Sequence, residues 1–431
     1  MQLDLQSYQN MPAARRWWVA YSGGVDSHCL LHALVKQTPP GLIAAVHIEH
    51  GIHPRSAQWV RHCAAVCSEL KIPFHFFRVR ISPGSGLEAI AREARYAVLA
   101  KVVSSGEIVF TAHHQDDQAE TLLLQLLRGS GPRGLGAMRK IVPFYKGYLA
   151  RPLLEISKKE ILVYAQQTGL RWIEDESNAD SRIPRNYLRN EVLPALESHW
   201  PSTTAVLARS AAHQAEASEL LDILAIQDLE TVVGTHPKTI QVDRLSRLTS
   251  SRVRNLLRYW IRDQGHLVPS TTVLQQVLEV LETRWDATPL VTWEGAEVRR
   301  YRNLLYLMRP LAPLPDPDWQ TTWNPVEPLV LPWGTLTAQL TTGSGFLANQ
   351  VTVRLRHGGE RFDFGSHHRP LKDLWQAAGI PPWERARTPL LFVGETLVAV
   401  PGLGVCSSSR HHFTKLDSQY LVHSLSWKQN S

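Results

Sequence analysis

The chain has 431 residues, of which 44% are hydrophobic and 20% are charged, a composition typical of a globular protein. No apolar run approaches the roughly 20 residues of a membrane-spanning helix, the segment MQLDLQSYQNMPAARRWW lacks the apolar core of a signal peptide, and four cysteines are too few for a disulfide framework. We therefore expect a cytoplasmic protein of two or three domains with no membrane partner. The net charge of +7 is compatible with a polyanionic partner such as RNA, although many cytosolic proteins are mildly basic without one.

Strand-like and helical segments alternate over the first half of the chain. Strands are predicted at residues 17–21, 42–48, 73–80 and 107–113, and helical patterns after the first strand and at 56–70, 87–103 and 115–128. Strands that alternate with helices of this length predict an α/β fold, a doubly wound parallel sheet with helices on both faces and right-handed connections.

The pattern changes twice in the second half. Amphipathic helical segments occupy 203–227 and 246–265, a proline-rich stretch covers 309–325, and short alternating apolar segments follow over 327–423. We expect three domains: an α/β domain at 1–201, a helical domain at 202–320 and a small α+β domain at 321–431.

A glycine turn joins the first predicted strand to the first helix. In this turn, Gly23 and Gly24 let the backbone approach an anion closely, the amides at the helix start point at it, and Ser22 and Ser27 add hydroxyl donors. The turn lacks the Lys-Ser/Thr ending of a Walker A loop and the three spaced glycines of a dinucleotide fingerprint. It therefore predicts a phosphate site of another kind, the alternative being an ordinary Gly-Gly turn.

Asp26 lies within this turn. A carboxylate beside phosphate oxygens is unfavourable unless a cation lies between them, and Mg²⁺ bound through one carboxylate and phosphates would meet that need. The alternative is that Asp26 is a helix cap.

A second group of polar residues follows the strand at 107–113. His113, Asp117 and Glu120 are spaced to share one helical face, and Asp116 adds a further negative charge. Such a cluster usually meets a cation, either a metal or an ammonium; a solvated acidic helix start and a metal-dependent phosphohydrolase are the alternatives. In the glycine-rich stretch behind the cluster, Arg128 and Arg133 are available for phosphate.

Three further sets of residues carry weaker signals. Arg182, Arg185 and Arg189 cluster around a predicted helix start, which favours phosphate or RNA backbone contact over solvated surface arginines. The triplet His47, His50 and His53 is compatible with zinc, but a strand-end loop near a nucleotide explains it better. Cys63 and Cys67 are expected to be buried core thiols.

The segment SGGVDS at residues 22–27 resembles the PP-loop of the N-type ATP pyrophosphatases. Members of that superfamily have a Rossmann-like fold, cut ATP between its α- and β-phosphates and leave AMP on an acceptor oxygen, from which a nucleophile displaces it. NAD, GMP and asparagine synthetases and several tRNA-modifying enzymes share the loop, so longer motifs must distinguish them.

The longer motifs together resemble the tRNA(Ile)-lysidine synthases. In chain order they read HIEHGIHPRSAQWVRHC, LEAIAREARYAVL, TAHHQDDQAETLLLQLLRGSG, RPLLEISKKEI and EDESNADSRIPRNYLRNEVLP, with a C-terminal segment around LKDLWQAAGIPPWERARTPLL. The resemblance is strong over 15–200 and 350–405 and weak between them. Glu49 departs from the expected Asn or His, and the absence of a Cys-x-x-Cys pair argues against the sulfur-inserting relatives.

The resemblance implies a two-step ligase reaction on the isoleucine tRNA that carries the anticodon CAU. ATP adenylates the C2 oxygen of the wobble cytidine, and the ε-amine of free L-lysine then displaces AMP to give lysidine. Pyrophosphate is the other product, and the codon read changes from AUG to AUA. The rivals are a PP-loop ligase acting on a small molecule, such as an NAD synthetase-like enzyme, and a non-catalytic tRNA-binding protein.

The resemblance also assigns roles to residues. Asp117 and Glu120 would receive the lysine, His113 would lie at the α-phosphate or carry a proton, Arg185 would stabilise phosphate charge, and Asp26 would hold Mg²⁺ or assist at the base. The expected ATP contacts are Ser22, Gly23, Gly24, Val25, Asp26, Ser27, His47 and Ile48. The expected tRNA contacts are Arg128, Arg133, Arg189, Arg254, Arg258, Lys372 and Arg385. Trp375 and Trp383 are assigned to stacking or, preferably, to the core, and a homodimer is one compatible state.

Overall fold

The computed structural model describes residues 2–5, 8, 16–49, 51, 55–80, 87–236, 238–284, 287–341, 346–347, 350–364, 367–406 and 421–429. The chain divides into two compact units, Met1–Leu221 and Asp222–Ser431. Among the described residues, no helix combines the length and the apolar character needed to cross a membrane.

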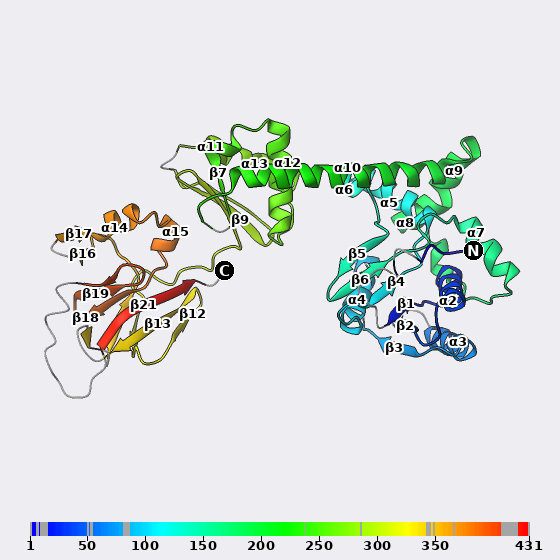
Figure 1. Cartoon of the computed structure of the whole chain (residues 1–431), viewed down its shortest axis with the longest axis horizontal. Helices are drawn as coiled ribbons and strands as arrows, with labels where there is room; N and C mark the ends of the chain where they lie inside the picture. The colour runs from blue at the N-terminus through cyan, green and yellow to red at the C-terminus, as the bar shows by residue number, and fades with distance from the viewer. Residues whose placement is uncertain are drawn as a thin grey trace. The chain divides into compact units, whose positions relative to one another are not determined.

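The first unit is built on a six-stranded sheet in the order β3-β2-β1-β4-β6-β5 (Figure 1). Neighbouring strands from β3 to β6 run parallel, and β5 pairs antiparallel with β6 at the edge. The strands are β1 Trp17–Ala20, β2 Ile43–Glu49, β3 Phe74–Arg78, β4 Ile108–Phe110, β5 Ile141–Phe144 and β6 Gly147–Ala150. The predicted parallel sheet is confirmed, and the β5–β6 hairpin is an addition that our reading of the sequence missed.

Helices cover both faces of this sheet, as a doubly wound fold requires. Trp17 and Val19 pack with residues of α2, α3 and α7 on one face, and Trp18 packs with residues of α4 on the other. The helical elements are α2 Val25–Gln37, α3 Ser56–Glu69, α4 Leu87–Val102, α5 Gln115–Leu127, α6 Pro132–Leu135, α7 Lys158–Gln167, the 3₁₀ turn η1 Glu176–Ala179, α8 Pro184–Tyr187, the π-helical turn η2 Leu188–Val192 and α9 Leu193–His199. The four predicted helices correspond to α2, α3, α4 and α5.

The middle of the chain contains the predicted helices and also a sheet. The helices are α10 Thr203–Val232, α11 Val242–Leu245, α12 Ser250–Asp263 and α13 Thr271–Glu282. The antiparallel sheet has the order β7-β10-β9-β8, with β7 Thr239–Gln241, β8 Leu290–Trp293, β9 Ala296–Tyr301 and β10 Leu304–Met308. Tight turns with positive φ at Gly295 and Arg302 connect its hairpins, and this turn signal outweighs the helical reading of the region.

The C-terminal part is a small α+β structure, as predicted. Its larger sheet has the order β11-β15-β18-β19-β20 and its second sheet the order β12-β13-β21-β14. Its elements are β11 Gln320–Trp323, β12 Leu329–Leu331, β13 Gly334–Thr341, β14 Phe346–Leu347, β15 Val351–Arg354, β16 Arg361–Phe364, β17 His367–Pro370, α14 Leu371–Ala377, α15 Pro382–Arg385, β18 Leu390–Val393, β19 Thr396–Val400, β20 Gly404–Val405 and β21 Leu421–Gln429. Trp375 and Trp383 are buried, which confirms the preferred core role.

Candidate active site

The candidate site lies where the strand order of the parallel sheet reverses. Strands β2 and β4 flank β1 on opposite sides, and the chain leaves β1 at Tyr21 and β4 at Thr111 along the same edge. In open α/β sheets, ligands bind outside the carboxyl ends of the strands at this switch point. The topology therefore brings together the glycine turn and the acidic helix start.

The glycine turn is an ordered loop that opens directly into α2. The hydroxyls of Ser22 and Ser27 are 3.0 Å apart, the Ser22 amide donates to Ser27 Oγ at 3.2 Å, and Ser27 Oγ donates to the Gly24 carbonyl at 3.0 Å. Gly24 is the N-cap of α2 and no side chain caps this end. The first amides of a helix have no carbonyl partner within it, so those of Val25 and Asp26 are suited to an anion.

Two neighbours fix the shape of this loop. Gly23 has φ of +89°, and a side chain there would place Cβ 2.5 Å from Ile173 Cδ1 and 2.9 Å from Cys63 Sγ. The Ile173 amide donates to the Gly23 carbonyl at 2.9 Å. From the other side, the ring of buried His47 is bonded through Nδ1 to the Tyr21 carbonyl at 2.8 Å. His47 therefore supports the loop from beneath; its own contact with ATP stays a prediction.

Asp26 is bound by a cation from α7. Lys158 Nζ lies 2.5 Å from Asp26 Oδ1, and the Lys158 amide donates to Asp116 Oδ2 at 2.9 Å. Ser157 and Glu160 form a capping box that fixes this end of α7. Lys158 therefore joins the phosphate loop to the start of α5, and its ammonium shows that Asp26 attracts a cation.

Three carboxylates surround the buried imidazole of His114. The Nε2 atom lies 3.8 Å from Asp26 Oδ2 and 3.6 Å from Asp117 Oδ2, and Nδ1 lies 3.4 Å from Asp116 Oδ2. Burial lowers the pKa of His114, but the three negative charges outweigh burial and raise its pKa above the ordinary value. The imidazole lies between Asp26 of the glycine turn and the two aspartates of α5, and it is biased toward its protonated, charged form.

Two arginines hold the carboxylate of Glu120. Arg189 Nε and Nη2 contact its two oxygens at 2.7 and 3.0 Å, and Arg185 Nε lies 2.9 Å from Oε2. Arg189 Nη2 also reaches Asp117 Oδ1 at 3.2 Å. Burial raises the pKa of Asp117, but His114 and Arg185, with other neighbours, outweigh burial and hold its pKa below the ordinary value.

This arrangement corrects the expected role of Glu120 and gives Arg189 a contact that was not expected, while its contact with tRNA stays a prediction. Glu120 is fully buried and both of its oxygens are bonded to arginine, so it positions Arg185 and Arg189 and does not face a ligand. Burial raises the pKa of Glu120, and Arg189 and Arg185 oppose that rise only in part. Arg189, expected to contact tRNA, lies in this cluster with its side chain 37% exposed.

His113 is the second histidine whose pKa responds to the charge of Asp117. Its Nδ1 is 2.9 Å from Thr111 Oγ1. Burial lowers the pKa of His113, Asp117 raises it, and the positive charges of Arg151, Arg95 and Arg92 lower it further, with a net shift downward. The pKa of His113 falls to about 3, so the imidazole is neutral near pH 7 and is a weak base.

The other expected contacts are distributed over both units. Arg128 and Arg133 are exposed around the end of α5 and on α6, and Ile48 is half-buried at the end of β2. In the second unit, Arg258 and Lys372 are exposed and Arg254 is half-buried. The residues that stay candidates for contact with tRNA in that unit are Arg254, Arg258 and Lys372.

Arg385 is not a surface contact. Its side chain is buried, with Nε donating to the Ile380 carbonyl at 2.6 Å and Nη2 to the Tyr301 hydroxyl at 2.7 Å. It therefore links α15 to β9 within the second unit, and the expected role in tRNA binding is wrong.

The histidine triplet does not form a described zinc site. The His47 ring is used by the Tyr21 carbonyl, and His50 and His53 lie outside the described residues. Within the described part of the chain, no group of three or more His, Cys, Asp or Glu residues is arranged to hold a metal. Cys63 and Cys67 are buried, as expected for core thiols.

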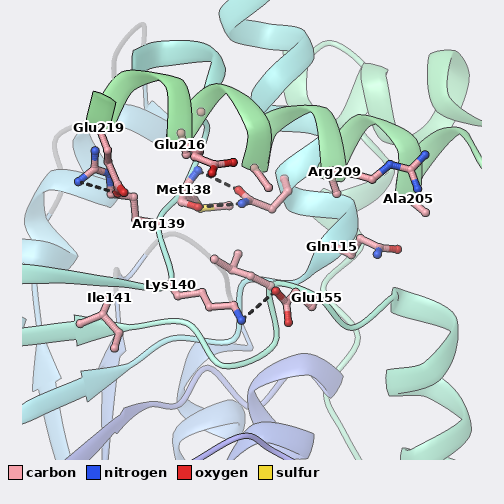
Figure 2. Close-up of a pocket in the computed structure, with 16 residues that line it drawn as sticks. Gln115, Met138, Arg139, Lys140, Ile141, Glu155, Ala205, Arg209, Glu216 and Glu219 are labelled. Carbon is pink, nitrogen blue, oxygen red and sulfur yellow. Dashed lines mark hydrogen bonds and ion pairs between the residues drawn. The ribbon is translucent and has the colours of Figure 1, made fainter. Parts of the chain in front are cut away.

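A pocket of about 620 Å³ lies on another face of α5 (Figure 2). Gln118 fixes the segment that borders it, because its Nε2 donates to the Met138 carbonyl at 2.7 Å and its Oε1 accepts from the Met138 amide at 2.8 Å. Ion pairs Arg139–Glu219 at 3.7 Å and Lys140–Glu155 at 2.8 Å lie at its wall. Neither Asp117 nor Glu120 lines it, so this pocket is separate from the candidate site.

Protein-family models match most of the chain. A family model described as the PP-loop domain matches residues 1–196. Models described as the TilS substrate binding domain and the TilS substrate C-terminal domain match residues 241–306 and 351–420. The phosphate loop and the acidic cluster both lie inside the first match.

Curated relatives extend this similarity to about nine tenths of the chain. A tRNA(Ile)-lysidine synthase of Coxiella burnetii is 42% identical over 90% of this chain and 89% of its own. The protein belongs to the tRNA(Ile)-lysidine synthase family. A second synthase of that family, from Methylococcus capsulatus, is 41% identical over 93% of this chain and 95% of its own.

Among solved structures, the U34-tRNA thiolase NcsA from Methanococcus maripaludis is 18% identical, covering 48% of this chain and 74% of that one. Its TM-score is 0.39, a value at which the likeness supports no conclusion about this lysidine synthase family member.

Several residues of the site escaped our reading of the sequence. Contacts with Asp26 are made by Lys158 and His114, and the charge of Arg151 lowers the pKa of His113. None of these three residues was assigned a role from the sequence. The signal available for Lys158 was its place directly after Ser157, the N-cap of a Ser157–Glu160 capping box, which marks a helix start but not what that start faces.

We expect Gly23→Ala to unfold at lower temperature than the unsubstituted chain and to lose ATP binding. The positive φ alone costs about 1–2 kcal/mol, and the added Cβ would meet Ile173 and Cys63. Thermal unfolding and equilibrium binding of ATP measure the two effects. Gly24→Ala is the matched control, because φ there is −71° and the nearest atom would be 3.5 Å away. Equal unfolding temperatures of the two variants would contradict the argument.

Proposed function

We propose that this protein is a cytoplasmic tRNA(Ile)-lysidine synthase, which uses ATP to join free L-lysine to the wobble cytidine of the CAU-anticodon isoleucine tRNA. The observation that carries the proposal is that one residue, Lys158, contacts both the phosphate loop at Asp26 and the acidic helix start at Asp116. A nucleotide bound on the loop would therefore lie next to carboxylates able to receive an amine. Belonging to the synthase family supports the same reaction.

The loop residues Ser22 to Ser27 bind the phosphates of ATP. Their hydroxyls and the amides at the start of α2 supply donors toward the pyrophosphate end. Asp26 fits Mg²⁺ because its carboxylate is partly exposed and already bound to an ammonium. The ion, when bound there, neutralises phosphate charge and makes the pyrophosphate a better leaving group.

The acidic helix start receives the lysine. Its ε-ammonium has a reference pKa of about 10.4, so it arrives charged and must lose a proton before it attacks. Asp117, ionised and slightly exposed, attracts the ammonium, which then loses its proton to solvent water. His113 stays neutral and is left to contact the α-phosphate. The amine nitrogen then bonds to C2 of the cytosine, and AMP leaves with the electrons of the C2–O bond. Arg185 stabilises the charge that builds on the phosphate.

The tRNA substrate contacts basic side chains of both units. Arg254 and Arg258 lie on α12, where Arg262 is instead paired with Asp222 at 2.7 Å. Arg128 and Arg133 offer further positive charge near the end of α5. The target base has to leave the anticodon stack to reach the site, as in other base-modifying enzymes.

One assay tests the proposal directly. The protein is incubated with ATP, Mg²⁺, radiolabelled L-lysine and CAU-anticodon isoleucine tRNA, and we expect label to enter the tRNA together with release of AMP and pyrophosphate. Methionine tRNA with the same anticodon is the control substrate and should stay unlabelled. An absence of label from the isoleucine tRNA would overturn the assignment, and ATP cleavage driven by a small acceptor without tRNA would favour the small-molecule ligase.

We expect Asp117→Asn to lose kcat/KM for L-lysine by on the order of 100-fold, because a carboxylate paired with an ammonium is replaced by a neutral amide. Asparagine keeps an oxygen for the His114 amide that Asp117 caps at 3.0 Å, so the helix start should survive. Lysine kinetics and ATP binding are measured in parallel, with exposed Glu69→Gln as the control. An equal loss of ATP binding would refute the assigned role.

The affinity of the protein for tRNA should fall as the salt concentration rises. In the double variant Arg254→Ala with Arg258→Ala, this affinity should fall less steeply. Removing two phosphate contacts is expected to reduce the slope of log affinity against log salt by about two. Filter binding of the tRNA at a series of salt concentrations gives both slopes, with Gln276→Ala on α13 as the control. Indistinguishable slopes would exclude these two arginines from the interface.

A further inference from the structure

A π-helical turn interrupts the helix that carries the two arginines of the site. The chain keeps right-handed helical angles from α8 through η2 into α9, but the Leu193 amide donates to the Leu188 carbonyl, five residues back. Single π turns inside α-helices frequently mark functional sites. This turn contains Arg189, and Arg185 lies one turn before it.

Pro194 explains why the helix widens here. A proline inside a helix has no amide hydrogen, and its ring would collide with the carbonyl four residues back, which belongs to Asn190. The wider turn from Leu188 to Val192 lies directly before the proline and avoids that collision. The proline therefore sets the position of Arg189 relative to α5.

The two arginines make unequal contacts with the two carboxylates. Arg189 holds Glu120 through two nitrogens at 2.7 and 3.0 Å, but reaches Asp117 through Nη2 alone at 3.2 Å. Glu120 is fully buried, and Asp117 is slightly exposed. Arg189 is thus able to release Asp117 without leaving Glu120.

We propose that Arg189 is a displaceable counter-ion of Asp117, which yields this carboxylate to the amine of the substrate and then favours loss of a proton from that amine. The inference rests on the proposed function. Without a substrate, Arg189 neutralises Asp117, and the arriving ammonium replaces one hydrogen bond of the guanidinium. Because Glu120 retains the guanidinium, the two positive charges become neighbours.

Crowding of two cations makes the ammonium easier to deprotonate. A cationic neighbour is a recognised means of activating an amine nucleophile, because the repulsion between two nearby positive charges favours the neutral form of the amine. The proton passes to solvent water, as in the reaction above. Arg189 is therefore a positioning residue whose removal should affect binding and turnover in opposite directions.

The test is the steady-state kinetics of Arg189→Gln with varied L-lysine, at saturating ATP and tRNA, over a range of pH. We expect KM for lysine to fall about tenfold, since a charge-assisted hydrogen bond no longer competes for Asp117. We expect kcat to fall and its rise with pH to move upward by about one unit or more, because the bound amine keeps its proton. Arg189→Lys should restore both properties toward those of the unsubstituted enzyme.

Two further variants separate this role from a structural one. Pro194→Ala should relax the π turn and shift KM and kcat in the same directions as Arg189→Gln. Glu191→Gln changes a charge on the same turn, where Glu191 is exposed and accepts from Ser181 at 3.5 Å, and should leave both constants unchanged. Circular dichroism and pyrophosphate release, which reports the adenylation step, verify that each variant is folded.

The outcomes distinguish this inference from the proposed function. If the unsubstituted enzyme incorporates lysine but Arg189→Gln raises KM or leaves the pH profile unchanged, the counter-ion role is overturned and the function stands. If the unsubstituted enzyme never incorporates lysine, the function itself fails. A fall in KM with a displaced pH profile, reversed by Arg189→Lys, supports the inference.

Discussion

The site depends on the neutralisation of carboxylates that the fold concentrates at one edge of its sheet. Asp26 from the glycine turn and Asp116, Asp117 and Glu120 from α5 lie close to one another, where their mutual repulsion would be strong without nearby cations. Lys158, His114, Arg185 and Arg189 supply those cations from α7, from the loop before α5 and from the helix of α8 and η2. Because these cations come from separate segments of the chain, the site is assembled only when the first unit folds.

Local patterns were sufficient to predict the scaffold and the position of the glycine turn between strand and helix. Gly23 and Gly24 between a strand and a helix have a direct physical reading, because few other residues permit such a turn, and the structure finds φ of +89° at Gly23. The parallel strands were predictable for the same reason: their apolar runs are short and each is followed by an amphipathic helix. These are features in which neighbours in sequence are also neighbours in space.

Features that depend on distant partners were not predictable. Glu120 shares its helical face with Asp117, so spacing alone treats them as equivalent. Arg189, more than sixty residues away, nevertheless binds both oxygens of Glu120 but only one oxygen of Asp117. The sequence likewise indicated a surface position for Arg385, whose guanidinium instead donates a hydrogen bond to the Tyr301 hydroxyl. The sheet in the middle of the chain was missed because two strong helical patterns dominated the turn signal at Gly295.

The contacts of Lys158 have a consequence for the affinities with which ligands bind at the site. Its ammonium and its own amide tie Asp26 to Asp116, so a ligand that changes the position of one carboxylate alters the environment of the other. Thermodynamic linkage then requires reciprocity: whatever factor the nucleotide imposes on the affinity for the amino acid, the amino acid imposes on the affinity for the nucleotide. In the function that we propose, a single lysine at the first turn of α7 thereby couples the binding of the two small substrates, although they need never touch each other before the reaction begins.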